Sequence, residues 1–334
     1  MPELPEVEVV RAGLDSLVRG ATITGVQIYR DSCVRLTPGG PGEFADAVDG
    51  RSIAAVVRRG KFLWMLLDGD ASEVALSAHL GMSGQFRVHA GDAPPAHRHC
   101  RARFTLTYPG EPQRALTLDF LDQRTFGYLH VEPVTATADA APGGQGSPAT
   151  VVPHSVTHIA RDVLDEHLDR DHTIAALRTG KRAIKQVLLD QTVVSGIGNI
   201  YADEALWSAQ VSPTLAAHAL SHSSAQDVLD AAYMVMTHAL VQGGTSFDAL
   251  YVNVNGESGY FSRTLQAYGR TGKPCARCGS AIERIVLGGR STHRCPNCQA
   301  DPPPLAAPPL DAPPLDAPNL SDVRHAGELG DLRL

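Results

Sequence analysis

The hydrophobic positions between residues 21 and 132 fall in short runs rich in β-branched and aromatic residues, and Gly, Pro and Asp turns separate these runs. Runs of this length and composition predict β-strands. Helices do not alternate with the runs, so the glycine pair at 196 and 198 is not the fingerprint of a dinucleotide-binding fold. Strands at this spacing favour an antiparallel β-sandwich. We expect them at residues 22–29, 52–58, 62–67, 73–78, 85–89, 101–108 and 115–121.

A helical pattern precedes the first strand. Pro5 suits the first turn of a helix, where its missing N–H is not needed. Apolar residues then recur at helical spacing, and Gly20 ends the pattern. They are Val7, Val10, Leu14, Leu17 and Val18.

The pattern becomes helical again from Thr173 onward. A turn with two glycines precedes Asn199, which is placed to cap the helix that follows. Another amphipathic helix is expected over residues 224–241, and a Gly-, Ser- and Asn-rich loop over residues 245–261.

Four of the six cysteines form two CxxC pairs, separated by sixteen residues. This spacing predicts one tetrahedral zinc ion bound by four thiolates, which leaves no open position for catalysis. The spacer between the pairs predicts a β-hairpin that turns at Gly288 and Gly289. The zinc would supply the folding energy of so short a unit. The predicted ligands are Cys275, Cys278, Cys295 and Cys298.

Charge and hydropathy limit the class of protein. The net charge of the chain is −7, and residues 300–334 contribute six acids and two arginines, a net of −4, which leaves −3 for the remainder. A DNA-binding surface would therefore have to be a local basic patch. No run of about 18 apolar residues is found, and acids occupy the place of a signal peptide's basic region. We expect a cytoplasmic protein without a membrane segment.

The first residues carry reactive groups. The small Pro2 permits removal of Met1, which would leave a secondary amine that titrates near ~8. Addition of this amine to an aldehyde-like carbon gives an iminium that stays cationic, and Glu3 beside it can give or take a proton. Both would lie at the positive end of a helix dipole, which lowers the pKa of the amine. By itself, this stretch favours an ordinary chain terminus.

The segment MPELPEVEVVR resembles the start of the bacterial formamidopyrimidine-DNA glycosylase family. The family's other segments follow in order over residues 2–299. They are Arg58-Arg59-Gly60-Lys61, His79 to Gly84, Asp122 to Gly127, Val194 to Glu204, and the two CxxC pairs. Several motifs in one chain are far more specific than any one of them. One departure is that Gln123 and Thr125 stand where the family more often has Pro and Arg.

The resemblance implies an α+β fold of several domains, with an N-terminal helix and antiparallel β-sandwich, a helical domain with a helix–two-turns–helix motif, and a C-terminal β-hairpin zinc finger. We expect a catalytic domain over 1–132, a linker over 133–155, the helical domain with a base-covering loop over 156–262, the zinc finger over 263–299, and a disordered Pro-rich tail over 300–334.

The resemblance also implies a bifunctional DNA glycosylase and abasic-site lyase that removes oxidised purines and cuts the strand by β,δ-elimination. Pro2 would be the nucleophile, Glu3 the acid, and Glu6 a supporting residue. Lys61, His79, Asn199 and Arg290 would bind phosphates, with Lys61 and Arg290 assisting catalysis. Met82, Arg124 and Phe126 would fill the gap left by the extruded base. Lys185 and Tyr201 are further expected DNA contacts.

Two other functions stay open at this point. One is an endonuclease VIII-type enzyme, with the same chemistry on oxidised pyrimidines. The other is a zinc-containing DNA-binding protein without catalysis, although the presence of both Pro2 and Glu3 argues against it. In the favoured interpretation, the protein is a monomer that acts on double-stranded DNA with oxidised bases or abasic sites, in a bacterial nucleoid.

Overall fold

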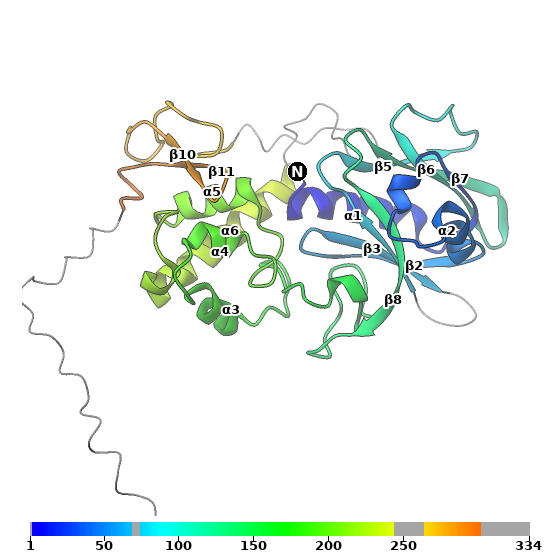
Figure 1. Ribbon diagram of the computed structural model, residues 1–334, viewed down its shortest axis with the longest axis horizontal. Coiled ribbons are helices and arrows are strands. Elements are labelled where there is room, and N and C mark those ends of the chain that lie inside the picture. Colours follow the sequence, from blue (N-terminus) through cyan, green and yellow to red (C-terminus); the bar gives the residue numbers. More distant parts are fainter. Residues whose placement is uncertain (1, 69–73, 244–263, 302–334) are drawn as a thin grey trace, which may run out of the picture. The chain divides into compact units, whose positions relative to one another are not determined.

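The computed structural model describes residues 2–68, 74–243 and 264–301 (Figure 1). The predicted base-covering loop over 245–261 and all but the first two residues of the predicted tail lie outside the described residues.

The first helix, α1 (Leu4–Val18), connects two hydrophobic cores. Leu4 packs with residues of the helical part of the chain. The remaining apolar face, which includes Val7, Val10 and Leu14, packs in the core of the β-sheet. The helix thereby places the N-terminal residues where these two parts meet (Figure 1).

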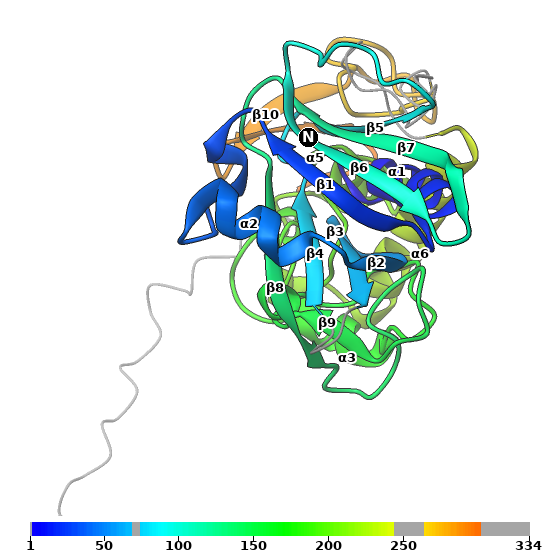
Figure 2. The ribbon, with the colours of Figure 1, turned by 90° about the vertical axis from the view of Figure 1, so that its right-hand side faces the viewer.

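One antiparallel sheet of nine strands forms the N-terminal part, in the order β5-β7-β6-β1-β2-β3-β4-β8-β9 (Figure 2). Strands β1 and β2 are joined at a single pair, Thr22 with Ser52. The strands on both sides of this junction contribute to one core around α1, as the sandwich prediction requires. The strands are β1 (Thr22–Ile28), β2 (Ser52–Arg59), β3 (Phe62–Asp68), β4 (Val74–His79), β5 (Gly84–Ala90), β6 (Cys100–Tyr108), β7 (Glu111–Asp122), β8 (Tyr128–Ala136) and β9 (Val151–Pro153). Two short helices, η1 (Asp31–Val34) and α2 (Gly40–Val48), follow β1.

Strands β8 and β9 were not among the seven predicted runs. The segment expected as a linker contains the end of β8 and all of β9, which pair over residues 134–136 and 151–153. Strand β8 also pairs with β4 along its length, where Leu129 is buried. The sheet therefore continues beyond the last predicted strand, while the division into domains stays a prediction.

The helical part has its own core and contains α3 (Arg170–Leu177), α4 (Ile184–Leu188), α5 (Asn199–Ser208) and α6 (His222–Val241), with short turns at η2 (His154–Val156) and η3 (Ala217–Ala219). A hairpin follows, with β10 (Glu283–Leu287) paired to β11 (Arg290–Arg294). Gly288 and Gly289 both have positive φ, +56° and +75°, as a two-residue turn of this kind requires. The predicted hairpin and its turn are confirmed. No helix within the described residues is long and apolar enough to cross a membrane.

Candidate active site

Four predicted site residues from separate segments of the chain line one cavity of about 190 Å³. Pro2 from the N-terminus, Lys61 from the β2–β3 turn, His79 from the end of β4 and Arg290 from the hairpin all line it. Each of the four was a predicted site residue. The fold therefore places the predicted amine beside three basic side chains.

Glu3 lies beside this cavity and caps a helix distant in sequence. Its carboxylate accepts the backbone N–H groups of Gly198 (2.8 Å), Ile200 (2.9 Å) and Tyr201 (3.2 Å) at the start of α5. The prediction that Asn199 caps this helix is therefore wrong: Gly198 is the N-cap residue, Asn199 is the first residue of the helix, and the Glu3 carboxylate accepts the N–H groups that a cap would take. A Cβ at Gly198 would lie 2.3 Å from Cδ of Glu3, so only glycine fits there.

The environment of Glu3 suits an acid. Burial raises the pKa of Glu3, and the nearby Glu6 carboxylate adds to this effect, whereas the Lys61 ammonium and the backbone N–H groups of α5 oppose it. Desolvation disfavours a charged carboxylate. A raised pKa increases the fraction of Glu3 that carries a proton, which is the form that can protonate a leaving oxygen.

Glu6 and Tyr201 form a buried pair behind Glu3. The Tyr201 hydroxyl donates to Oε1 of Glu6 at 2.8 Å, and Oε2 of Glu6 accepts the backbone N–H of Glu3 at 2.9 Å. The predicted supporting position of Glu6 agrees with this geometry. Tyr201 is 0% exposed, so the structure contradicts a DNA contact by its side chain.

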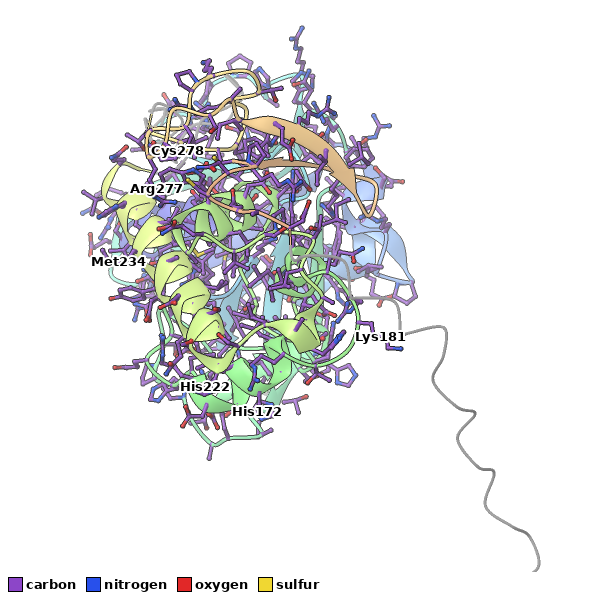
Figure 3. All side chains as sticks on the ribbon, turned by 90° about the vertical axis from the view of Figure 1, so that its left-hand side faces the viewer. His172, Lys181, His222, Met234, Arg277 and Cys278 are labelled. Carbon is purple, nitrogen blue, oxygen red and sulfur yellow. The ribbon has the colours of Figure 1, made fainter. Side chains whose placement is uncertain are left out.

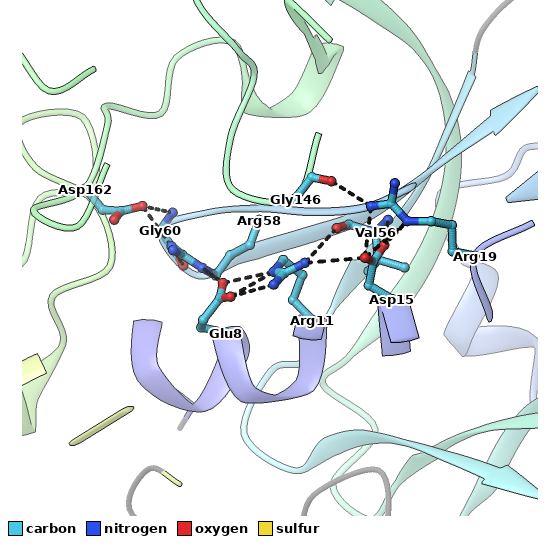
Figure 4. A network of polar contacts seen from close by, with 9 residues as sticks. All are labelled: Glu8, Arg11, Asp15, Arg19, Val56, Arg58, Gly60, Gly146 and Asp162. Carbon is cyan, nitrogen blue, oxygen red and sulfur yellow. Dashed lines mark hydrogen bonds and ion pairs between the residues drawn. The ribbon is translucent and has the colours of Figure 1, made fainter. Parts of the chain in front are cut away.

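The turn that carries Lys61 is held by contacts that sequence reasoning missed. Asp162 accepts the backbone N–H of Gly60 at 2.9 Å and the Arg58 guanidinium at 2.8 Å, and Arg58 also pairs with Glu8 of α1 (Figure 4). This buried network fixes the turn that carries Lys61. The Lys61 ammonium donates to the carbonyl of Ile197 at 2.7 Å, and burial lowers its pKa.

Lys185 does not face the cavity. It is 1% exposed and forms an ion pair with Asp203 at 2.6 Å. Its ammonium also donates to the carbonyl of Ser291 and the hydroxyl of Thr292 in β11. The structure therefore contradicts a direct DNA contact by Lys185, because its donors are used to join α4 and α5 to the hairpin.

Asn199 begins α5 and Arg290 begins β11, two of the elements that the Lys185 contacts join. The Asn199 amide donates to the carbonyl of Ser291 at 2.9 Å. The side chain of Arg290 is exposed, and within the described residues it has no hydrogen-bond or ion-pair partner. Its guanidinium is therefore available for a phosphate.

Replacing Arg290 with alanine should weaken binding of all DNA sequences about equally and reduce the slope of log K against log salt by about 1, because one phosphate contact is lost. Fluorescence anisotropy titrations over a range of salt concentrations measure both quantities. Arg284→Ala is the matched control, since this exposed hairpin arginine is held by the Ser291 hydroxyl. Equal salt slopes for Arg290→Ala and the wild type would contradict the phosphate contact.

His79 is arranged to donate from one particular nitrogen. Its Nδ1 accepts the backbone N–H of Gly81 at 3.2 Å, so the neutral ring carries its proton on Nε2. Burial lowers the pKa of His79, as does the nearby Arg35 guanidinium, which favours this neutral form. The ring stacks on Tyr128, with the ring centres 5.0 Å apart.

The three predicted gap-filling residues lie together at the surface. Met82 is 42% exposed and Phe126 is 55% exposed, on loops that lie in contact with each other. The Arg124 guanidinium contacts the sulfur of Met82 at 3.5 Å. An exposed apolar group beside a cation is the arrangement that base extrusion requires.

The four predicted zinc ligands lie within 4.8 Å of one another, at the base of the hairpin. Figure 3 shows Cys278 and its neighbour Arg277 in this unit. Four cysteine sulfurs at this separation fit one tetrahedral zinc ion. The buried apolar side chains here are few, essentially Ile282 and the cysteines, with Trp207 packed against them. With so few apolar side chains, a zinc ion bound here would supply much of the folding energy of this unit.

Comparisons with known proteins match this architecture. The family models that match are the formamidopyrimidine-DNA glycosylase N-terminal domain over residues 1–129, the H2TH domain of the same enzyme over 159–249, and the zinc finger found in FPG and IleRS over 272–300.

Similar whole proteins are also found. The formamidopyrimidine-DNA glycosylases of Thermobifida fusca and Rhodococcus jostii are 49% and 48% identical to this chain, over 90% of the chain and 98% and 97% of their own lengths. Among solved structures, the MutM (Fpg) protein of Thermus thermophilus is 34% identical, with a TM-score of 0.71. The Lactococcus lactis Fpg in complex with abasic-site DNA is 30% identical, with a TM-score of 0.72, and both matches cover 90% of this chain and 100% of the other. The chain belongs to the formamidopyrimidine-DNA glycosylase family.

Proposed function

We propose that the protein is a bifunctional DNA glycosylase and abasic-site lyase of base excision repair, and that oxidised purines are its main substrates. The observation that carries this proposal is the single cavity shared by Pro2, Lys61, His79 and Arg290, with Glu3 buried beside it. It combines a nucleophile, an acid and phosphate-binding groups within one site, which is the set of roles the reaction needs.

The reaction begins when the nitrogen of Pro2, free once Met1 is removed, forms a bond to C1′ of the damaged nucleotide. The bond from C1′ to the base breaks, and the departing base takes up the proton that the Pro2 nitrogen loses. Glu3 protonates the ring oxygen as its bond to C1′ breaks, which gives the open-chain iminium. Loss of a proton from C2′ expels the 3′ phosphate, and a second elimination expels the 5′ phosphate, with both protons passing to water.

The DNA contacts follow from the charges around the cavity. Lys61 and Arg290 are cationic, and the Nε2–H of His79 has no acceptor among the described residues, so these groups would hold the phosphates beside the damaged nucleotide. Asn199 stands next to them at the start of α5. Such a local basic site reconciles DNA binding with a net charge of −7. We further propose that the protein acts as a monomer in the bacterial cytoplasm, on nucleoid DNA.

An endonuclease VIII-type enzyme would differ from the proposed enzyme in the damaged base that it prefers. The structures of the Lactococcus lactis Fpg include a complex of a mutant with Fapy-dG DNA and a complex of the wild type with DNA that contains an oxidised pyrimidine. A site of this family therefore admits more than one kind of damaged base.

Borohydride trapping tests the proposal, since reduction of an iminium links protein and DNA covalently. We expect a trapped adduct on a duplex with 8-oxoguanine opposite cytosine, together with an intact mass that lacks Met1. A stronger adduct on thymine glycol would favour the endonuclease VIII-type specificity. No adduct on either duplex or on abasic DNA, with zinc bound and Met1 absent, would leave only the DNA-binding protein without catalysis.

A further inference from the structure

One buried carboxylate joins the two loops that carry the gap-filling residues. Asp122, at the end of β7, is 1% exposed. Its Oδ1 accepts the hydroxyl of Ser83 at 2.5 Å and the backbone N–H of Arg124 at 3.2 Å, while its Oδ2 accepts the backbone N–H of Gly127 at 2.7 Å. Asp122 thus contacts the β4–β5 loop, which carries Met82, and both ends of the β7–β8 loop.

Ser83 completes the connection between the loops. While its hydroxyl donates to Asp122, its oxygen accepts the backbone N–H of Arg124 at 2.9 Å. The loops also approach closely elsewhere, because a Cβ at Gly81 would lie 2.8 Å from the backbone nitrogen of Gly127. The two loops are therefore packed and hydrogen-bonded as one unit.

The β7–β8 loop needs this support because its backbone is strained. Thr125 has φ of +56°, a left-handed conformation that is costly for a β-branched residue. Arg35 supports the same loop from its outer side, where its guanidinium donates to the carbonyls of Phe126 and Gly127 and lies 4.6 Å from the centre of the Tyr128 ring. The hydrogen bonds to Asp122 hold the inner side.

We propose that Asp122 is a positioning residue that holds Met82, Arg124 and Phe126 in one fixed arrangement, so that all three enter the base stack together when the damaged base is extruded. This inference rests on the proposed function, because it concerns the extrusion step of that reaction. Asp122 is not a catalytic residue, since it is buried behind the loops and is not among the residues that line the Pro2 cavity.

The test compares two substrates for Asp122→Ala. Excision of 8-oxoguanine from a duplex requires the gap to be filled, whereas cleavage of an abasic site in single-stranded DNA leaves no orphaned partner base. We expect single-turnover excision from the duplex to fall roughly tenfold or more, because buried hydrogen bonds to a charged group are lost. Cleavage of the single strand should stay within about twofold of the wild type.

Asp119→Ala is the matched control. Asp119 is a buried carboxylate of the same strand, three residues earlier, and it pairs with Arg103 at 2.6 Å instead of with the loops. It should alter thermal stability without changing the ratio of the two rates. Ser83→Ala is a milder second variant that removes only the link between the loops, and it should lower the same ratio by a smaller factor.

A parallel loss on both substrates in Asp122→Ala would overturn the positioning role and indicate a general folding defect. An unchanged rate on the duplex in Ser83→Ala and Asp122→Ala would overturn it as well. Failure of the proposed function gives a different result, because it is seen in the wild-type protein: a protein without catalysis would cleave neither substrate, and an endonuclease VIII-type enzyme would cleave the abasic site but not excise 8-oxoguanine.

Discussion

Replacing Pro2 with glycine should reduce the borohydride-trapped adduct on 8-oxoguanine DNA by about a hundredfold or more, which is the loss expected when the nucleophile of a covalent mechanism is impaired. Glycine keeps an N-terminal amine but not the pyrrolidine ring. Its imine can lose a proton and become neutral, so it is a weaker electron sink for elimination. Pro2 also lines the cavity that would hold the sugar, so its removal alters the packing there. Quantitative trapping with the purified variant measures the effect.

Glu3→Gln gives the informative contrast, because it keeps the amine and removes the acid. We expect this variant to release 8-oxoguanine roughly 100-fold more slowly, as for the loss of a general acid. A preformed abasic site should still be trapped, since its open-chain form needs no protonation of the ring oxygen. Glu3 also caps α5, so thermal unfolding must be measured in parallel. Full trapping by Pro2→Gly would show that the pyrrolidine ring is not required, and peptide mapping that placed the DNA adduct on Lys61 instead of the N-terminal amine would overturn the assignment of the nucleophile.

Much of the fold could be predicted from local patterns. The seven predicted strands match β1 to β7 to within a few residues, because their turns and β-branched residues are local signals. Strands β8 and β9 were not predicted, because they are defined by their pairing with β4 and with each other. The Pro-, Ala- and Gly-rich segment between them also resembles a linker. Such pairing is a tertiary property that a local pattern does not contain.

The sequence predicted the site only for side chains whose role is set by the family's motifs. The family resemblance named Pro2, Lys61, His79 and Arg290 as site residues, and all four line one cavity in the structure. It could not indicate that Glu3 caps α5, because the two are about 195 residues apart in sequence. It also suggested DNA contacts for Lys185 and Tyr201, which the structure buries.

The missed residues share one property. Asp122, Asp162 and Asp203 are acids with almost no exposure, and each joins segments that are distant in the sequence. A lone acid in a sequence is most often a solvent-exposed residue, so only the tertiary structure distinguishes these three. Each has hydrogen-bond or ion-pair partners in the structure, as a buried polar group requires.

Replacing Cys278 with serine should remove the zinc ion and weaken DNA binding about tenfold or more, because the hairpin carries Arg290 and the Asn199 contact. The metal contributes on the order of 10 kcal/mol in comparable small zinc units, and the few apolar side chains here cannot replace it. The N-terminal sheet has its own core and should stay folded. Zinc analysis of the purified variant, DNA titration and circular dichroism measure the three outcomes.

Cys33→Ser is the control, since Cys33 is a buried cysteine of the sheet core and lies outside the cluster of four. It should keep a full complement of zinc. A Cys278→Ser protein with normal zinc content would overturn the four-cysteine assignment.

The effect of Cys278→Ser on the kinetics of the enzyme also follows from the architecture. Pro2 and Glu3 precede α1, and the N-terminus of α5 holds the Glu3 carboxylate, so neither residue depends on the hairpin for its place in the chain. Cys278→Ser should therefore raise the KM for abasic DNA much more than it lowers kcat, and trapping should recover at high DNA concentration. A loss confined to kcat would instead indicate that the hairpin positions the reacting groups themselves.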